Sequence, residues 1–145
     1  MRNLFVTALV LTAFMAAAAS SHPETLDELK QRAAAAKPGD QPKLFLEVAE
    51  RQLHAARDAY EQDKRDEAPA TVEEVASYCE KAAAAAIHSQ KYVKQAEIRV
   101  RDMIRSLDAL RHTLASDDRA PVQTVIDRME RVRSDLLAAM FGTKP

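Results

Sequence analysis

The side chains best suited to metal binding or nucleophilic chemistry are few in this 145-residue sequence: Cys79, His22, His54, His88 and His112. A cysteine-based zinc site or a disulfide framework needs more than one cysteine, so both are excluded. His88 and His112 lie about 36 Å apart if the segment between them is one helix, so they cannot share a metal. His54 could face His88 across a helical hairpin, but two imidazoles alone make a poor metal site. We therefore expect no metal site, with His54, His88 and His112 as the candidates for one.

Cofactors carried in helical bundles need ligands that the sequence does not supply in the usual pattern. A di-iron bundle needs Glu-x-x-His motifs on two helices, whereas Glu50 and His54 are four residues apart. A bundle haem would need an axial pair such as histidine with methionine, but Met103, Met129 and Met140 fall on apolar faces that are typical of a core. We expect no cofactor, and a haem- or metal-binding periplasmic bundle is the alternative.

Nucleophilic catalysis finds no support either. Cys79 occupies an apolar stripe between Val75 and Ala82, which predicts a buried, inert thiol, although an unpaired cysteine in an exported chain could also join two copies. His88 and Ser89 are adjacent on a helix and point in different directions, so they do not form a base and nucleophile pair. We expect that the protein is not an enzyme.

Basic residues gather in the second half of the chain. Residues 22–80 carry 8 basic and 14 acidic side chains, whereas residues 91–133 carry 10 basic and 7 acidic ones. This pattern predicts either a solvated helix surface with pairs such as Glu97–Arg101 and Asp127–Arg131, or a rod with an acidic end and an arginine-rich end. Such a rod could pair head to tail or meet an acidic partner. The candidate interaction residues are Arg99, Arg101, Arg105, Arg128 and Arg131. A net charge of −1 and a basic face without interleaved glycine or aromatic residues argue against nucleic acid as the partner.

The first 21 residues have the order of features typical of a secretory signal peptide. Arg2 supplies a positive start, residues 4–19 are nearly all apolar, and small residues follow up to Ser21. The apolar run is short for a retained transmembrane helix of roughly 20 residues. We therefore expect export to the periplasm or the extracellular space, and no stable membrane span after cleavage.

Residues 22–145 then read as one helical domain. Capping boxes at Thr25–Glu28 and Thr71–Glu74, together with proline and glycine, predict helices at about 25–36, 41–62, 71–114 and 121–141. Between Thr71 and Leu114 apolar residues recur every three or four positions, and neither glycine nor proline interrupts them. This coiled-coil-like pattern predicts one long helix of roughly 65 Å; a pair of helices broken between His88 and Tyr92 is the other interpretation. The expected fold is all-α, an elongated antiparallel bundle with shorter helices along this central one.

Two resemblances accompany this interpretation. Ala59-Tyr60 followed by Lys64-Arg65-Asp66-Glu67-Ala68 resembles the turn of a tetratricopeptide-type hairpin, over roughly residues 44–90. That resemblance implies a helical hairpin presenting a binding groove. As a whole, the chain is similar to small exported all-helical bacterial proteins of uncharacterised function. The expected function is therefore protein–protein interaction, with an unknown partner or with a second copy.

Overall fold

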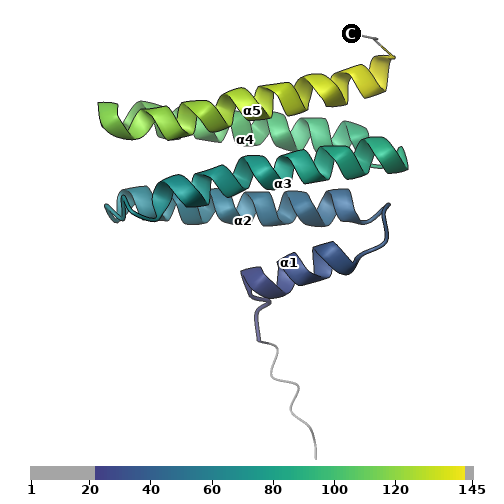
Figure 1. Ribbon diagram of the computed structural model, residues 1–145, viewed down its shortest axis with the longest axis horizontal. Helices are drawn as coiled ribbons and strands as arrows, with labels where there is room; N and C mark the ends of the chain where they lie inside the picture. The colour runs from purple at the N-terminus through teal and green to yellow at the C-terminus, as the bar shows by residue number, and fades with distance from the viewer. Residues whose placement is uncertain (1–21, 143–145) are drawn as a thin grey trace, which may run out of the picture.

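The computed structural model describes residues 22–142, which form five α-helices (Figure 1). They are α1 (Leu26–Ala35), α2 (Gln41–Glu61), α3 (Ala68–Ser89), α4 (Val93–Thr113) and α5 (Ser116–Phe141). The expected signal peptide, residues 1–21, lies outside the described residues. Within 22–142, no helix combines the length and apolar character that a membrane crossing requires.

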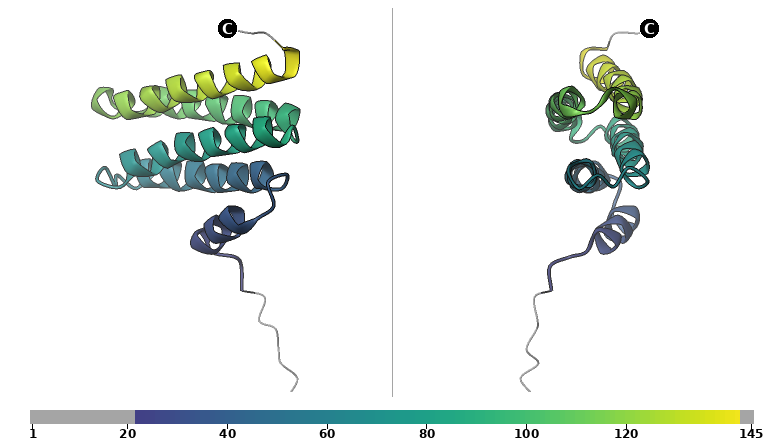
Figure 2. Two further views of the ribbon diagram at one scale, coloured as in Figure 1. Left: turned by 45° about the vertical axis from the view of Figure 1, so that its right-hand side comes forward. Right: turned by 90° about the vertical axis from the view of Figure 1, so that its left-hand side faces the viewer.

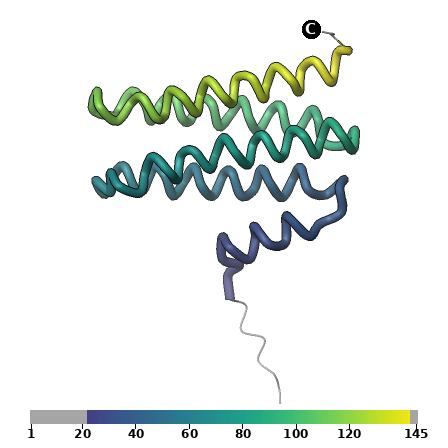
Figure 3. Tube along the Cα trace, viewed as in Figure 1, coloured from purple at the N-terminus to yellow at the C-terminus, as the bar shows by residue number. Residues whose placement is uncertain are grey.

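The helices pack as two antiparallel hairpins, α2–α3 and α4–α5, stacked on each other (Figures 1 and 3). Seen along the helices, α2 and α4 lie in one row, and α1, α3 and α5 lie in the other (Figure 2). The short α1 packs on α2 at the end of the stack away from α5. The prediction of an all-α antiparallel bundle is thus confirmed.

The prediction of one long central helix, however, is wrong, and the other interpretation, two helices broken between His88 and Tyr92, is confirmed. Residues 71–114 are divided between α3 and α4, and the chain reverses through Gln90, Lys91 and Tyr92. Gln90 (φ 56°) and Tyr92 (φ 68°) adopt left-handed backbone conformations, which side-chain-bearing residues rarely do. The reversal brings Ala96, Val100 and the rest of the α4 apolar stripe onto the first hairpin, and this burial outweighs the backbone cost of the turn. The elongated bundle built on one spine is therefore replaced by two stacked hairpins.

Some of the helix ends lie where the sequence predicts them, and others do not. Thr25 and Glu28 form the expected capping box at the start of α1, and Gly142 (φ 65°) ends α5 in the left-handed conformation that glycine favours. The second expected capping box is wrong. α3 begins at Ala68 rather than Thr71, because Pro69 in the first turn needs no hydrogen bond from its nitrogen. The Thr71 hydroxyl instead donates to the Glu67 carbonyl at 3.0 Å.

α5 also starts earlier than expected, at Ser116 rather than Pro121. Pro121 lies inside the helix near its N-terminal end, and Asp117 and Asp118 occupy the first turn, where acidic side chains interact favourably with the helix dipole. The predicted helix start at Pro121 is therefore wrong, because the helix begins five residues earlier.

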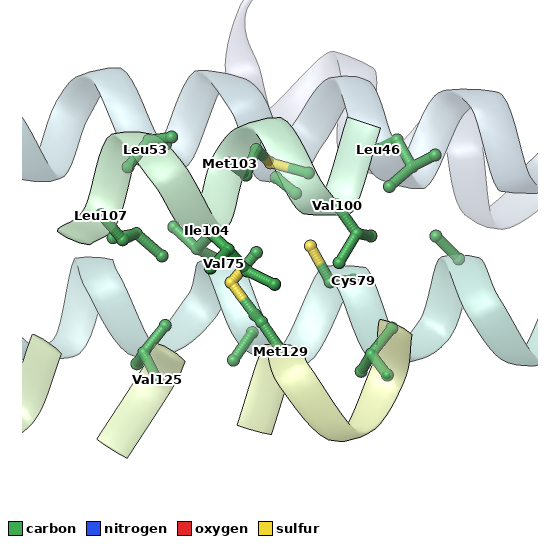
Figure 4. Packing of buried hydrophobic residues seen from close by; sticks show 14 of the residues in the cluster. Leu46, Leu53, Val75, Cys79, Val100, Met103, Ile104, Leu107, Val125 and Met129 are labelled. Carbon is green, nitrogen blue, oxygen red and sulfur yellow. The ribbon is translucent and has the colours of Figure 1, made fainter. Parts of the chain in front are cut away.

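One main core fills the space between the two hairpins, and a smaller one lies beneath α1. Figure 4 shows side chains of α2, α3, α4 and α5 meeting in the main core, among them Leu53, Val75, Val100 and Met129. The smaller core consists of Leu29, Ala33, Leu44 and Val48. The main core therefore depends on contact between the hairpins, whereas the smaller core attaches α1 to the first of them.

Candidate functional site

Arg99, the first of the candidate interaction residues, holds α4 against α2. Its guanidinium donates to both carboxylate oxygens of Glu50, at 2.8 and 2.7 Å. It also donates to the Tyr92 hydroxyl at 3.2 Å and to the Lys43 carbonyl at 3.4 Å. The hydrogen bonds to Glu50 raise the pKa of Arg99. This bidentate pair joins the two hairpins, so most of the donor capacity of Arg99 is used within the molecule.

Arg128 joins α5 to α3 in the same way as Arg99 joins α4 to α2. Its Nε and Nη2 atoms lie 2.8 and 3.1 Å from the Glu80 carboxylate oxygens, and its Nη1 atom lies 3.6 Å from Glu73. Hydrogen bonding to Glu80 raises the pKa of Arg128. A second connection between the hairpins therefore runs from an arginine of the basic half to glutamates of the acidic half.

A buried carboxylate organises the α4–α5 hairpin. The Glu97 side chain is 7% exposed and accepts a hydrogen bond from Arg133 at 2.9 Å. Arg101 lies 3.8 Å from the same carboxylate, as the spacing of four residues predicted. Removing a carboxylate from water is costly unless cations and donors surround it, and these two arginines meet that need.

The remaining two candidates are more open to solvent. Arg105 has a side chain 73% exposed and lies 3.6 Å from Asp102. Arg131 is exposed, and among residues 22–142 no carboxylate lies within 4.0 Å of it. The expected Asp127–Arg131 pair is not formed, and Asp127 accepts a hydrogen bond from Gln123 instead.

These contacts change the meaning of the uneven charge distribution. The acidic first half and the basic second half lie side by side, and Glu50–Arg99 and Glu80–Arg128 pair their charges across the interface. The interpretation as a rod with an acidic end and an arginine-rich end depended on the continuous helix, and it is wrong for the same reason.

The histidines that could have formed a metal site are separated. His54 is exposed on α2, His88 is exposed near the end of α3, and His112 is exposed near the end of α4. The Nδ1 atom of His112 lies 2.7 Å from the Asp108 carbonyl oxygen. Across residues 22–142 there is no group of three or more His, Cys, Asp or Glu side chains able to hold a metal ion.

The methionines and the cysteine belong mainly to the core. Met103 and Met129 are 4% and 0% exposed, and Met140 is partly buried near the end of α5. Cys79 is fully buried in the main core between the hairpins (Figure 4), and burial raises the pKa of its thiol far above the ordinary value. A disulfide between two folded copies through this sulfur would require the core to open.

A polar network that the sequence did not reveal ties the first three helices together. Gln52 is 5% exposed on α2 and donates to Glu74 of α3, and Lys30 of α1 donates to the same carboxylate at 2.8 Å. The expected role of Glu74 in a capping box is wrong, because the carboxylate points toward these partners. The sequence contains one indication of this network, because Gln52 is a polar residue between Ala49 and Ala56 on the apolar stripe of α2.

The surface of the described region has several shallow clefts. One of about 300 Å³ lies between the C-terminal halves of α2 and α4 and includes Tyr60, whose buried hydroxyl has no hydrogen-bond partner within residues 22–142. Another, of about 350 Å³, lies beside the α3–α4 turn and is lined by Ile87, Gln90, Val93, Ala139 and Met140. Four of these five side chains are apolar, so the second cleft offers contact area rather than catalytic groups.

Comparison with known proteins adds no further constraint: neither a family model, nor a curated protein, nor a solved structure matches this chain.

Proposed function

We propose that this chain is an exported, non-catalytic helical-bundle protein that acts in the periplasm or extracellular space through protein–protein contact. The partner is an unlike protein or a second copy of the chain. The charged side chains that sequence reasoning selected are used largely to join the helices, and this use supports a structural rather than a catalytic role for them.

The observation that carries the proposal is the apolar surface beside the α3–α4 turn. Ile87 and Phe141 are 38% and 74% exposed, and they are two of the three large apolar side chains exposed within residues 22–142. Ile87 also lines the cleft formed with Val93 and Met140, the residue just before Phe141. Apolar surface gathered in this way is typical of sites where proteins bind one another. The exposed cations Arg105 and Arg131 are proposed as additional contact residues.

Export is tested by the fate of residues 1–21. Fused to a reporter enzyme that is active only outside the cytoplasm, these residues are expected to give activity and to be absent from the mature chain by mass spectrometry. The control carries Leu11→Arg, which interrupts the apolar run and should abolish the signal. Equal reporter activity from both fusions contradicts export by this segment.

Contact through the apolar cleft is tested by photocrosslinking in the native cell envelope. A photoreactive phenylalanine analogue replaces Phe141 in one variant, and the same analogue replaces the exposed Thr124 in a control variant. We expect a discrete adduct from position 141 and none from position 124. An adduct of twice the chain mass identifies a second copy, another mass identifies an unlike partner, and the absence of adducts from both positions contradicts the proposal.

A further inference from the structure

We propose that the α2–α3 surface that receives the α4–α5 hairpin also accepts the α4–α5 hairpin of a second copy, so that two chains exchange hairpins when the turn at Gln90–Tyr92 opens. The second copy is then the partner, and the proposal rests on the proposed function of protein–protein contact. In the exchanged dimer α3 and α4 form one straight helix over residues 68–113.

The turn is the first observation. Gln90 and Tyr92 both have positive φ angles, a conformation disfavoured by any side chain with a Cβ atom, and glycine occupies neither position. The side-chain hydrogen bonds at the turn are long, with the Lys91 amide donating to the Ser89 hydroxyl at 3.3 Å. Straightening the chain would relieve two strained residues and add helical backbone hydrogen bonds. The closed turn is therefore intrinsically costly.

The apolar pattern across the turn is the second observation. Ala82, Ala86, Ser89, Val93 and Ala96 follow one another at intervals of three or four residues. In a continuous helix these positions stay on one face, because the helix repeats every 3.6 residues. The sequence thus supports the straight helix as well as it supports the two separate ones.

The contacts between the hairpins are the third observation. α4–α5 is held to α2–α3 by the main core and by the Glu50–Arg99 and Glu80–Arg128 pairs, none of which requires that both hairpins belong to one chain. α3 and α4, the helices joined by the turn, make little contact with each other compared with α3 and α5. Nearly every stabilising contact can therefore re-form between two chains.

The apolar cleft is the fourth observation. Ile87 and Val93 line it from the two sides of the turn, and both are partly open to solvent in the closed form. In an exchanged dimer the two straightened segments meet at the two-fold axis, so that these side chains can cover those of the other chain. Dimerisation would remove apolar surface that the monomer leaves exposed.

A matched pair of variants at Gln90 tests the hinge. Gln90 is exposed, so Gln90→Gly and Gln90→Ala change the backbone preference with little loss of contact. Glycine favours the left-handed turn, whereas alanine favours the helix. After refolding from urea over a range of concentrations, light scattering and sedimentation should give a dimer dissociation constant at least tenfold lower for Gln90→Ala than for Gln90→Gly. Equal constants, or monomers throughout, overturn the proposal.

Charge reversal then separates hairpin exchange from side-by-side association. A Glu50→Arg chain has two arginines at the contact with α4, and an Arg99→Glu chain has two glutamates there. Each chain alone carries a like-charge pair, whereas an exchanged heterodimer of the two restores opposite charges at both contacts. We expect dimers of mixed composition to exceed either homodimer at least tenfold after the two are refolded together. A second pair, Glu80→Arg with Arg128→Glu, repeats the test at a more exposed contact should the first pair fail to fold.

The outcomes keep this inference distinct from the proposed function. Dimers that show no preference for the mixed composition contradict hairpin exchange but leave protein–protein contact in place. A chain that stays monomeric in both tests, yet yields an unlike adduct from position 141 in the envelope, overturns the exchange and supports the proposed function.

Discussion

The two hairpins have the same architecture but achieve it with side chains of different size. Alanine makes up eight of the seventeen buried residues of α2 and α3, namely Ala49, Ala56, Ala59, Ala68, Ala76, Ala82, Ala83 and Ala86. Those of α4 and α5 are mostly large, including Val100, Met103, Ile104, Leu107, Val122, Val125, Ile126, Met129, Val132 and Leu136. The backbones of α2 and α3 are also in contact more extensively than those of α4 and α5. The first hairpin therefore relies more on extensive backbone contact, and the second relies more on contact between large side chains.

This difference means that the two hairpins should fail under opposite changes. Truncating a buried side chain costs the most packing energy where large residues interdigitate, so the second hairpin should be sensitive to truncation. Adding volume is most disruptive where alanines allow close approach, so the first hairpin is sensitive to enlargement.

The largest effect is expected from truncation in the second hairpin. Leu107 is fully buried, so Leu107→Ala leaves a cavity and should lower the free energy of unfolding by about 2–5 kcal/mol. Urea unfolding followed by circular dichroism measures the change. Ile98→Ala on the same helix is the control. Because Ile98 is 36% exposed, this substitution should lower the free energy of unfolding far less. Equal losses at both positions would show that α4 is not packed as described.

Enlargement in the first hairpin should have the next largest effect. Ala82 is fully buried in α3, so Ala82→Leu should cost about 1–3 kcal/mol in unfolding free energy through displaced neighbours. Ala84→Leu is the matched control, since Ala84 is exposed two residues along the same helix. If the two leucine variants unfold at the same urea concentration, the close approach of α2 and α3 does not limit side-chain size.

A substitution in the turn between the hairpins should instead raise the free energy of unfolding. In the monomer, Gln90→Gly removes the penalty of a positive φ angle and should raise the free energy of unfolding by about 1 kcal/mol. The measurement is made at a concentration where light scattering shows monomer only. Gly142→Ala places a Cβ atom in the same backbone conformation at the end of α5 and should lower stability. A destabilised Gln90→Gly monomer would contradict the left-handed turn.

The smallest effect concerns the attachment of α1 to the first hairpin. Hydrogen bonding from Arg32 lowers the pKa of Glu24 below its ordinary value of 4.5, and the charge of Arg51 on α2, 3.8 Å from the same carboxylate, lowers it further. A carboxylate whose pKa is lower in the folded state stabilises that state above the unfolded pKa and loses this contribution as the pH falls through the folded pKa. Nuclear magnetic resonance signals of Leu29 and Ala33 should therefore show weaker α1 packing at pH 3 than at pH 6. Glu24→Gln should remove that part of the pH dependence, and an unchanged profile would assign it to other groups.

The sequence was sufficient for features that local chemistry decides. Thr25 and Glu28 fixed the start of α1, and Gly142 fixed the end of α5. It was insufficient where tertiary contact decides. A continuous apolar stripe fits a straight helix and two stacked ones equally well, and Gln90 is not a residue that ends helices by its own preference. Partners such as Glu50 and Arg99, 49 residues apart, became recognisable only once the chain was known to reverse.

The Glu50–Arg99 and Glu80–Arg128 pairs should also constrain how the sequence can change. A substitution that reverses the charge at position 50 or 80 places like charges against each other at the interface, and a second substitution at position 99 or 128 restores the attraction. Descendants of this sequence should therefore change sign at these positions two at a time. The pairing would be visible as covariation between residues of the acidic and the basic halves, even where no single position is kept.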